Sequence, residues 1–88
     1  MTNGERLRRW VLETTQMMVD RPEDVKVDLV EGQGSIELRV VPHPYDVGKL
    51  IGKQGRAARS LRTIGSAIAM TMGVRLTVDI REDNERPL

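Results

Sequence analysis

Six positive charges with no acid among them mark the segment of this chain that could bind a ligand. Between Val47 and Val78 there is no Asp or Glu, whereas Lys or Arg occupies positions 49, 53, 56, 59, 62 and 75. Two glycines in the same segment, Gly52 and Gly55, would let a bound molecule approach the backbone closely. Cations beside an open backbone indicate a phosphate-bearing ligand, and RNA is the ligand that we expect.

The net charge of the whole chain hides this segregation. It is only +1, so the residues outside the 47–78 segment sum to −5. A local basic patch can hold phosphates without a basic protein around it. The alternative is a basic helix face whose cations pair with acids elsewhere in the fold, and charge alone does not choose between the two.

The composition argues against most other functions. The chain has no cysteine, and its single histidine, His43, lies between two prolines, where we expect an exposed loop. This inventory offers no metal site, cofactor site or catalytic pair, so we expect neither an enzyme nor a small-molecule substrate. No apolar run reaches the roughly 18 to 20 residues that span a bilayer, and no secretory signal is present, so we expect a cytoplasmic protein. With one Trp, one Tyr and no Phe, any RNA groove would be aliphatic.

The first half of the chain predicts a helix and a β-hairpin. Thr2 and Glu5 resemble a capping box that begins an amphipathic helix, which Asp-Arg-Pro at 20–22 ends. Apolar residues alternate over 25–29 and over 36–40, with glycines between the two runs. That pattern is typical of two antiparallel strands joined by a turn.

The second half predicts two helices around the glycines and a last strand. A short helix over 45–51 precedes the loop, and a longer helix over 56–72 follows it until Gly73 ends it. We expect the buried face of the longer helix to carry Ala57, Leu61, Ile64, Ile68 and Met72. A strand over 74–80 completes the order α-β-β-α-α-β. The fold class is therefore α+β, a two-layer sandwich in which a three-stranded sheet has three helices on one face.

The glycine loop suits a phosphate backbone for several reasons. The helix that follows it directs the positive end of its dipole toward the loop. Lys53 lies at the loop tip as a mobile cation, and Arg56 and Arg59 would extend the basic track at helical spacing. A nucleotide-binding P-loop is a poor alternative, because the stretch from Gly48 has one residue too few, lacks the Ser/Thr and follows a helix.

The ten residues 47–56, Val-Gly-Lys-Leu-Ile-Gly-Lys-Gln-Gly-Arg, resemble the core of a KH domain, whose pattern is I-G-x-x-G flanked by aliphatic residues. The order of elements resembles the bacterial type II arrangement. The resemblance covers residues 1–81 as a single domain and leaves 82–88 as a flexible tail. A stand-alone KH domain of this length is similar to the small bacterial KhpA family.

The resemblance implies which residues would contact RNA. KH domains bind about four single-stranded nucleotides, with the loop clamping the backbone and an aliphatic groove holding the bases. The clamp would be Gly52, Lys53, Gln54 and Gly55, flanked by Lys49, Arg56 and Arg59. The groove would be lined by Gly48, Ile51 and Ile64, with Arg75 on the opposite wall.

The resemblance also implies partners and a cellular role. Members of the KhpA family are RNA-binding proteins and RNA chaperones that pair with a larger KH protein, KhpB (also called Jag). The family is linked to cell elongation and envelope homeostasis. We therefore expect a homodimer or a heterodimer, and no membrane partner. The alternative is an interaction adaptor whose fold mainly docks another protein.

Overall fold

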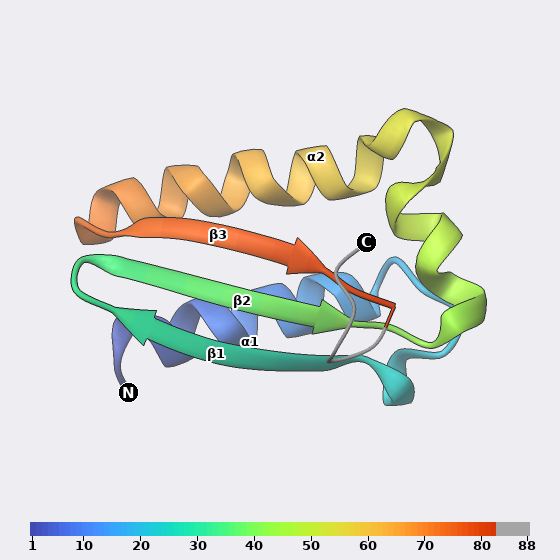
Figure 1. Ribbon diagram of the computed structural model, residues 1–88, viewed down its shortest axis with the longest axis horizontal. Helices are drawn as coiled ribbons and strands as arrows, with labels where there is room; N and C mark the ends of the chain where they lie inside the picture. Colours follow the sequence, from blue (N-terminus) through green and yellow to red (C-terminus); the bar gives the residue numbers. More distant parts are fainter. Residues whose placement is uncertain (83–88) are drawn as a thin grey trace.

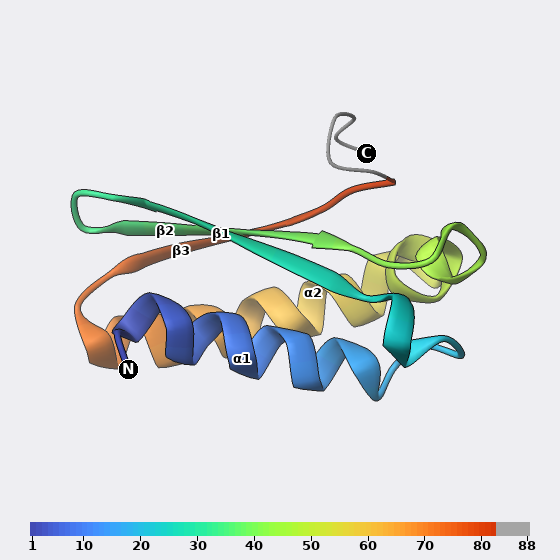
Figure 2. The same ribbon diagram turned by 90° about the horizontal axis from the view of Figure 1, so that it is seen from below.

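The computed structural model describes residues 1–82 and shows a sheet covered on one face by two helices (Figures 1 and 2). The sheet contains β1 (Lys26–Gly32), β2 (Ser35–Val41) and β3 (Arg75–Ile80), in that order. The helices are α1 (Asn3–Gln16) and α2 (Val47–Met72), and the 3-10 turns η1 (Pro22–Asp24) and η2 (Pro44–Asp46) precede β1 and α2. The α+β class and the two layers are confirmed. Residues 83–88, which make up most of the predicted tail, lie outside the described part.

The first helix begins as its sequence predicts. The Thr2 hydroxyl oxygen accepts a hydrogen bond from the Glu5 backbone N–H at 3.1 Å, which satisfies one of the free donors at the helix start. The helix ends at Gln16, one turn before the predicted stop at 20–22. No helix within residues 1–82 combines the length and apolar character needed to cross a bilayer.

The predicted hairpin is confirmed, and β3 adds a parallel strand to it. Strands β1 and β2 pair antiparallel around a turn closed by Gly32 and Ser35, where Gly34 has the left-handed φ of 69° that glycine tolerates. Strand β3 pairs parallel to β2, from Ser35–Arg75 to Val40–Ile80. Helix α2 provides the crossover between the two parallel strands (Figure 1). Gly73 caps that helix with a φ of 75°, also as predicted.

The structure has two helices rather than the predicted three, because the short and long helices join at a kink instead of forming separate elements. Helix α2 spans Val47–Met72, but Gly52–Gly55 lack helical angles, so that a short helical arm and a long one meet there. The loop is therefore a kink inside α2, visible at the end of the molecule where the chain doubles back (Figure 1). The first residues of the predicted short helix, Tyr45 and Asp46, belong to the 3-10 turn η2.

The buried face of α2 is also displaced from the predicted one. The fully buried residues are Leu50, Ala58, Leu61, Gly65 and Ala69. Of the predicted set, Leu61 is buried and Ile68 and Met72 are partly buried against the core. Ile64 is 54% exposed. A Cβ on Gly65 would lie 2.9 Å from the Leu76 side chain and 3.3 Å from Trp10, so small residues let α2 pack closely there. The sequence pattern gave most weight to large side chains and missed a face made of small ones.

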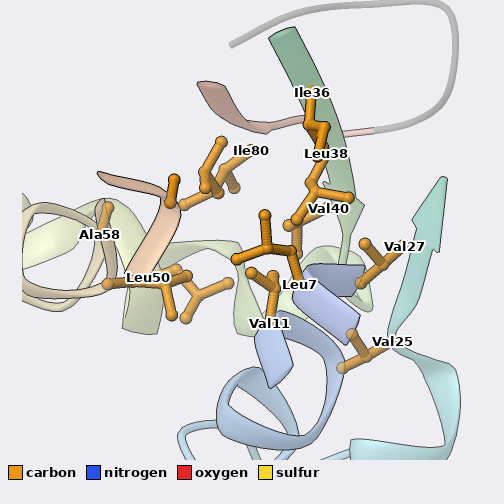
Figure 3. Packing of buried hydrophobic residues seen from close by; sticks show 13 residues of the cluster. Leu7, Val11, Val25, Val27, Ile36, Leu38, Val40, Leu50, Ala58 and Ile80 are labelled. Carbon is orange, nitrogen blue, oxygen red and sulfur yellow. The ribbon is translucent and has the colours of Figure 1, made fainter. Parts of the chain in front are cut away.

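The core lies between the sheet and the two helices (Figure 3). Leu7 and Val11 of α1 meet Leu38 and Val40 of β2, and all four are fully buried. Leu50, on the short arm of α2 before the kink, enters the same cluster, which anchors the kink to the core. Thr15 is also fully buried, and its hydroxyl has no hydrogen-bond partner within residues 1–82.

Candidate nucleic-acid interface

The kink in α2 is a loop of unusual backbone conformation. Gly52 is extended, with φ −72° and ψ 177°, whereas Lys53, Gln54 and Gly55 have the positive φ angles 50°, 64° and 67°. Of these three residues with positive φ, only Gly55 is a glycine. A non-glycine residue held in this region costs on the order of 1–3 kcal/mol and is most common at functional sites. Two such residues in succession, at the predicted clamp, indicate a conformation kept for a ligand.

Gly52 has no structural need to be a glycine. Its φ angle suits any residue, and a Cβ added to it would meet no atom within 4 Å. The space beside Gly52 is therefore open to a second molecule. Neither the backbone conformation nor the packing requires a glycine at this position.

Arg59 holds the loop from the helix that follows. Its Nη2 atom donates a hydrogen bond to the Gln54 carbonyl oxygen at 2.8 Å. This bond ties the second left-handed residue to the next turn of α2. The prediction placed Arg59 in the basic track as a phosphate ligand, whereas the geometry also gives it a role in positioning the clamp.

The cations at the loop differ in whether a carboxylate pairs with them. Within residues 1–82, neither Lys53 nor Arg56 has a carboxylate within salt-bridge distance, and both are exposed. Lys49 is different, because its Nζ lies 3.4 Å from Asp20 Oδ2. The alternative of a basic face paired with acids therefore applies to Lys49 but not to Lys53 and Arg56.

Buried Asp46 fixes the start of α2 against the end of α1. Its carboxylate accepts the backbone N–H groups of Asp20 at 3.3 Å and Arg21 at 3.0 Å. These two bonds join segments 25 and 26 residues apart in the sequence. The residues after α1 are thereby held beside the glycine loop.

A hollow of about 540 Å³ opens between these segments. It brings together five of the predicted RNA-binding residues and three that the prediction did not include. The predicted ones are Gly48, Lys49, Gly52, Lys53 and Arg56, and the others are Met18, Tyr45 and Ala57.

The predicted groove residues lie farther along α2. Ile51 is 40% exposed at the loop, and Ile64 is exposed two turns beyond it, so both are accessible to a ligand. Arg75 is not close to the clamp, because it begins β3 just after α2 ends at Met72, at the end of α2 opposite the kink (Figure 1). The 17 helical residues from Arg56 to Met72 separate the two by about 25 Å. Arg75 instead lines a hollow of about 470 Å³ beside Val74 and Met70.

The seam between α2 and β3 contains Arg62, one of the six cations of the basic segment, and Ser66, which the prediction did not include. Arg62 reaches across it and donates from Nε to the Val78 carbonyl oxygen at 3.0 Å. With Ser66, it lines a smaller hollow of about 200 Å³ on this seam. Its helical spacing from Arg59 was visible in the sequence, but its partner on β3 was not.

The outer face of the sheet is a weaker candidate for RNA. Two of its cations pair with neighbouring acids: Arg39 Nε lies 2.6 Å from Glu37, and Arg81 Nε lies 2.8 Å from Asp79. The hydrogen bond to Glu37 and its charge raise the pKa of Arg39 above the ordinary value. Paired guanidinium groups attract phosphate less than unpaired ones, so the loop of α2 is the better site.

The chain is similar to known proteins over the glycine loop and the elements around it. The KH-domain model of the KhpA/KhpB family matches residues 8–80, which include every residue predicted to bind RNA. The protein named RNA-binding protein KhpA from Clostridium perfringens is 46% identical over 63 residues, which cover 72% of this chain and 84% of the relative.

Two other relatives bear the same name. The protein from Aquifex aeolicus is 41% identical over 69 residues, covering 78% of this chain and 87% of its own length. That from Clostridium acetobutylicum is 44% identical over 71 residues, covering 80% of this chain and 95% of its own length. These names describe RNA binding and no catalytic activity.

Proposed function

This chain belongs to the KhpA/KhpB family of KH domains, and we propose that it is a non-enzymatic protein that binds single-stranded RNA through the Gly52–Gly55 loop. The observation that carries the proposal is the loop itself. It combines left-handed backbone at Lys53 and Gln54, open space beside Gly52, and two cations that lack acid partners among residues 1–82.

The RNA would lie along α2. The backbone of about four nucleotides would pass over the loop, with Lys53 and Arg56 contacting phosphates. The bases would follow α2 past Ile51 and Ile64. Arg75 would contact only a strand that continues to the far end of α2.

The cellular role that we propose is that of an RNA chaperone or post-transcriptional regulator in the bacterial cytoplasm, where its RNA ligands are found. A clamp for about four nucleotides binds weakly alone, so a second RNA-binding domain would raise the affinity through avidity. We propose a KhpB/Jag-type partner or a second copy of this chain for that purpose. A link to cell elongation and envelope homeostasis would follow from the RNA targets of such a pair.

The test is fluorescence anisotropy of a labelled mixed-sequence single-stranded RNA across a salt series. Wild type should bind with an affinity that falls as salt rises, at a slope of about −0.7 per neutralised phosphate. The Lys53→Asp/Gln54→Asp variant should keep its circular dichroism spectrum and lose binding. Equal affinity in the two proteins would refute the loop as the RNA clamp.

A second candidate function is protein docking, and exposed apolar side chains on α2 favour it. Ile64 is 54% exposed and Met70 is 79% exposed. An adaptor would keep its protein partner in the Lys53→Asp/Gln54→Asp variant, whereas an RNA-bridged complex would fall apart. Co-purification of a tagged variant with and without ribonuclease distinguishes the two.

A further inference from the structure

The hollow beside the glycine loop shares no lining residue with the two hollows on the seam between α2 and β3. Its lining comes from the turn after α1, from η2 and from α2 around the kink, and includes Met18, Tyr45 and Gly48. No residue of β3 contributes to it, whereas β3 forms one wall of the hollows at the seam. An RNA strand clamped on the loop could therefore extend into this hollow as well as along α2.

Tyr45 gives this hollow an aromatic platform. Its side chain is 77% exposed, although it lies in a 3-10 turn held to the core through the neighbouring Asp46. The Arg21 guanidinium carbon lies 5.1 Å from the ring centroid, and the His43 ring lies 5.1 Å away at an angle of 59°. The backbone N–H of Tyr45 donates to His43 Nδ1 at 3.0 Å. The ring is thus oriented but largely uncovered, which suits stacking by a base.

The charges around the hollow suit a phosphate group. Lys49, Lys53 and Arg56 line it, and no carboxylate is among its lining residues. Two acids close to these segments already have partners. Asp20 pairs with Lys49, and the buried Asp46 carboxylate accepts two backbone N–H groups. A volume of about 540 Å³ falls within the roughly 300–1,000 Å³ range of small-molecule sites, so one nucleotide fits.

We propose that this hollow is a subsite for one further nucleotide of the bound RNA, with its base stacked on Tyr45 and its phosphate held by Lys49 and Lys53. The inference rests on the proposed function, because the loop must first clamp the strand. It extends the binding site beyond the about four nucleotides of a KH clamp. It also gives an aromatic contact to a domain whose composition predicts an aliphatic groove.

The test compares wild type, Tyr45→Ala and Tyr45→Phe on fluorescein-labelled oligoadenylates of four, six and eight nucleotides. All three proteins should bind the tetramer alike. On the six-mer and eight-mer, Tyr45→Ala should bind at least about fivefold more weakly than wild type, which is the smallest effect usual for a base stacked on an aromatic side chain. Tyr45→Phe keeps the ring and should match wild type.

A second measurement identifies the nucleotide. An abasic residue is placed at the 5′ end or at the 3′ end of the six-mer. Wild type should lose affinity for one of these two oligomers only, and Tyr45→Ala should lose nothing further on the same oligomer, because the stacking partner is already absent. Circular dichroism confirms that each variant is folded.

Three outcomes would overturn the subsite. These are equal binding of all lengths by Tyr45→Ala and wild type, an equal loss at every length including the tetramer, and a Tyr45→Ala defect confined to self-association in light scattering. Failure of the proposed function would look different. In that case the Lys53→Asp/Gln54→Asp variant would bind the tetramer as wild type does.

Discussion

Arg59 donates a hydrogen bond from its guanidinium to the carbonyl oxygen of Gln54, 2.8 Å away and five residues earlier in the chain. The Gly52–Gly55 loop, the proposed RNA clamp, is thus held by a side chain that also carries one of the positive charges beside it. Gln54 is one of the two non-glycine residues with positive φ. The bond therefore acts on the part of the loop whose backbone is least favourable without support.

This relationship predicts that charge alone will not replace Arg59. The Arg59→Lys variant keeps the positive charge but loses the planar guanidinium that spans the distance to Gln54. We expect weaker RNA binding with an unchanged salt slope. In Arg59→Ala, both the affinity and the slope should fall if the guanidinium also contacts a phosphate. Anisotropy titrations at several salt concentrations measure both quantities, and wild-type affinity in Arg59→Lys would refute the positioning role.

Removing the acid next to Lys49 should strengthen RNA binding. Asp20→Asn leaves the backbone N–H of residue 20 bonded to Asp46 but frees the Lys49 ammonium, now 3.4 Å from the carboxylate. Exposed ion pairs of this kind contribute roughly 0.2–1 kcal/mol, so affinity should rise by up to about fivefold. Glu13→Gln is the matched control, because it breaks the exposed pair with Arg9 on α1. An equal rise in both variants would mean a general charge effect.

The two glycines of the loop should respond differently to alanine. Gly52→Ala should leave the melting temperature unchanged, since its φ is ordinary and its Cβ meets no atom, yet it should weaken RNA binding. Gly52→Asp should weaken it further by repelling phosphate. Gly55→Ala should destabilise the fold by about 1–2 kcal/mol because of its φ of 67°. Thermal melts and anisotropy check both, and a lower melting temperature in Gly52→Ala would make Gly52 structural.

Thr15→Val should stabilise the protein. The hydroxyl is fully buried without a partner among the described residues, and Val has nearly the same shape without the polar atom. We expect the free energy of unfolding to rise by about 1 kcal/mol in urea denaturation. Thr14→Val, at a partly exposed position on the same helix, should gain nothing. A loss of stability in Thr15→Val would show that the hydroxyl is satisfied in solution.

Features set by a few adjacent residues could be predicted from the sequence. The Thr2 cap, the turn at Gly34 and the stop at Gly73 each depend on local backbone chemistry, and each is present. The glycine loop was found for the same reason. The two-layer arrangement follows from amphipathic helices and alternating strands, whereas the sequence predicted no partner for β3, which lies parallel to β2.

Features that depend on contacts between distant segments were not predicted. The buried face of α2 was misplaced because Ala58 and Gly65 pack closely without being strongly hydrophobic. The pairing of Lys49 with Asp20 joins residues on different elements, so no local pattern reveals it. Arg75 is far from the clamp because the long arm of α2 lies between them, and the glycine motif alone does not show how the two ends of that arm are placed.

The parallel pairing of β2 with β3 has a consequence for how the binding site forms. The paired residues Ser35 and Arg75 are 40 positions apart, and the whole of α2 lies between them. The β1–β2 hairpin closes a short loop and can form early, whereas parallel pairing across a long crossover is slow. The kink of α2 is anchored by Leu50 and Ala58 in the core that this last pairing completes. A nascent chain therefore displays no finished clamp until its final strand has been synthesised and docked.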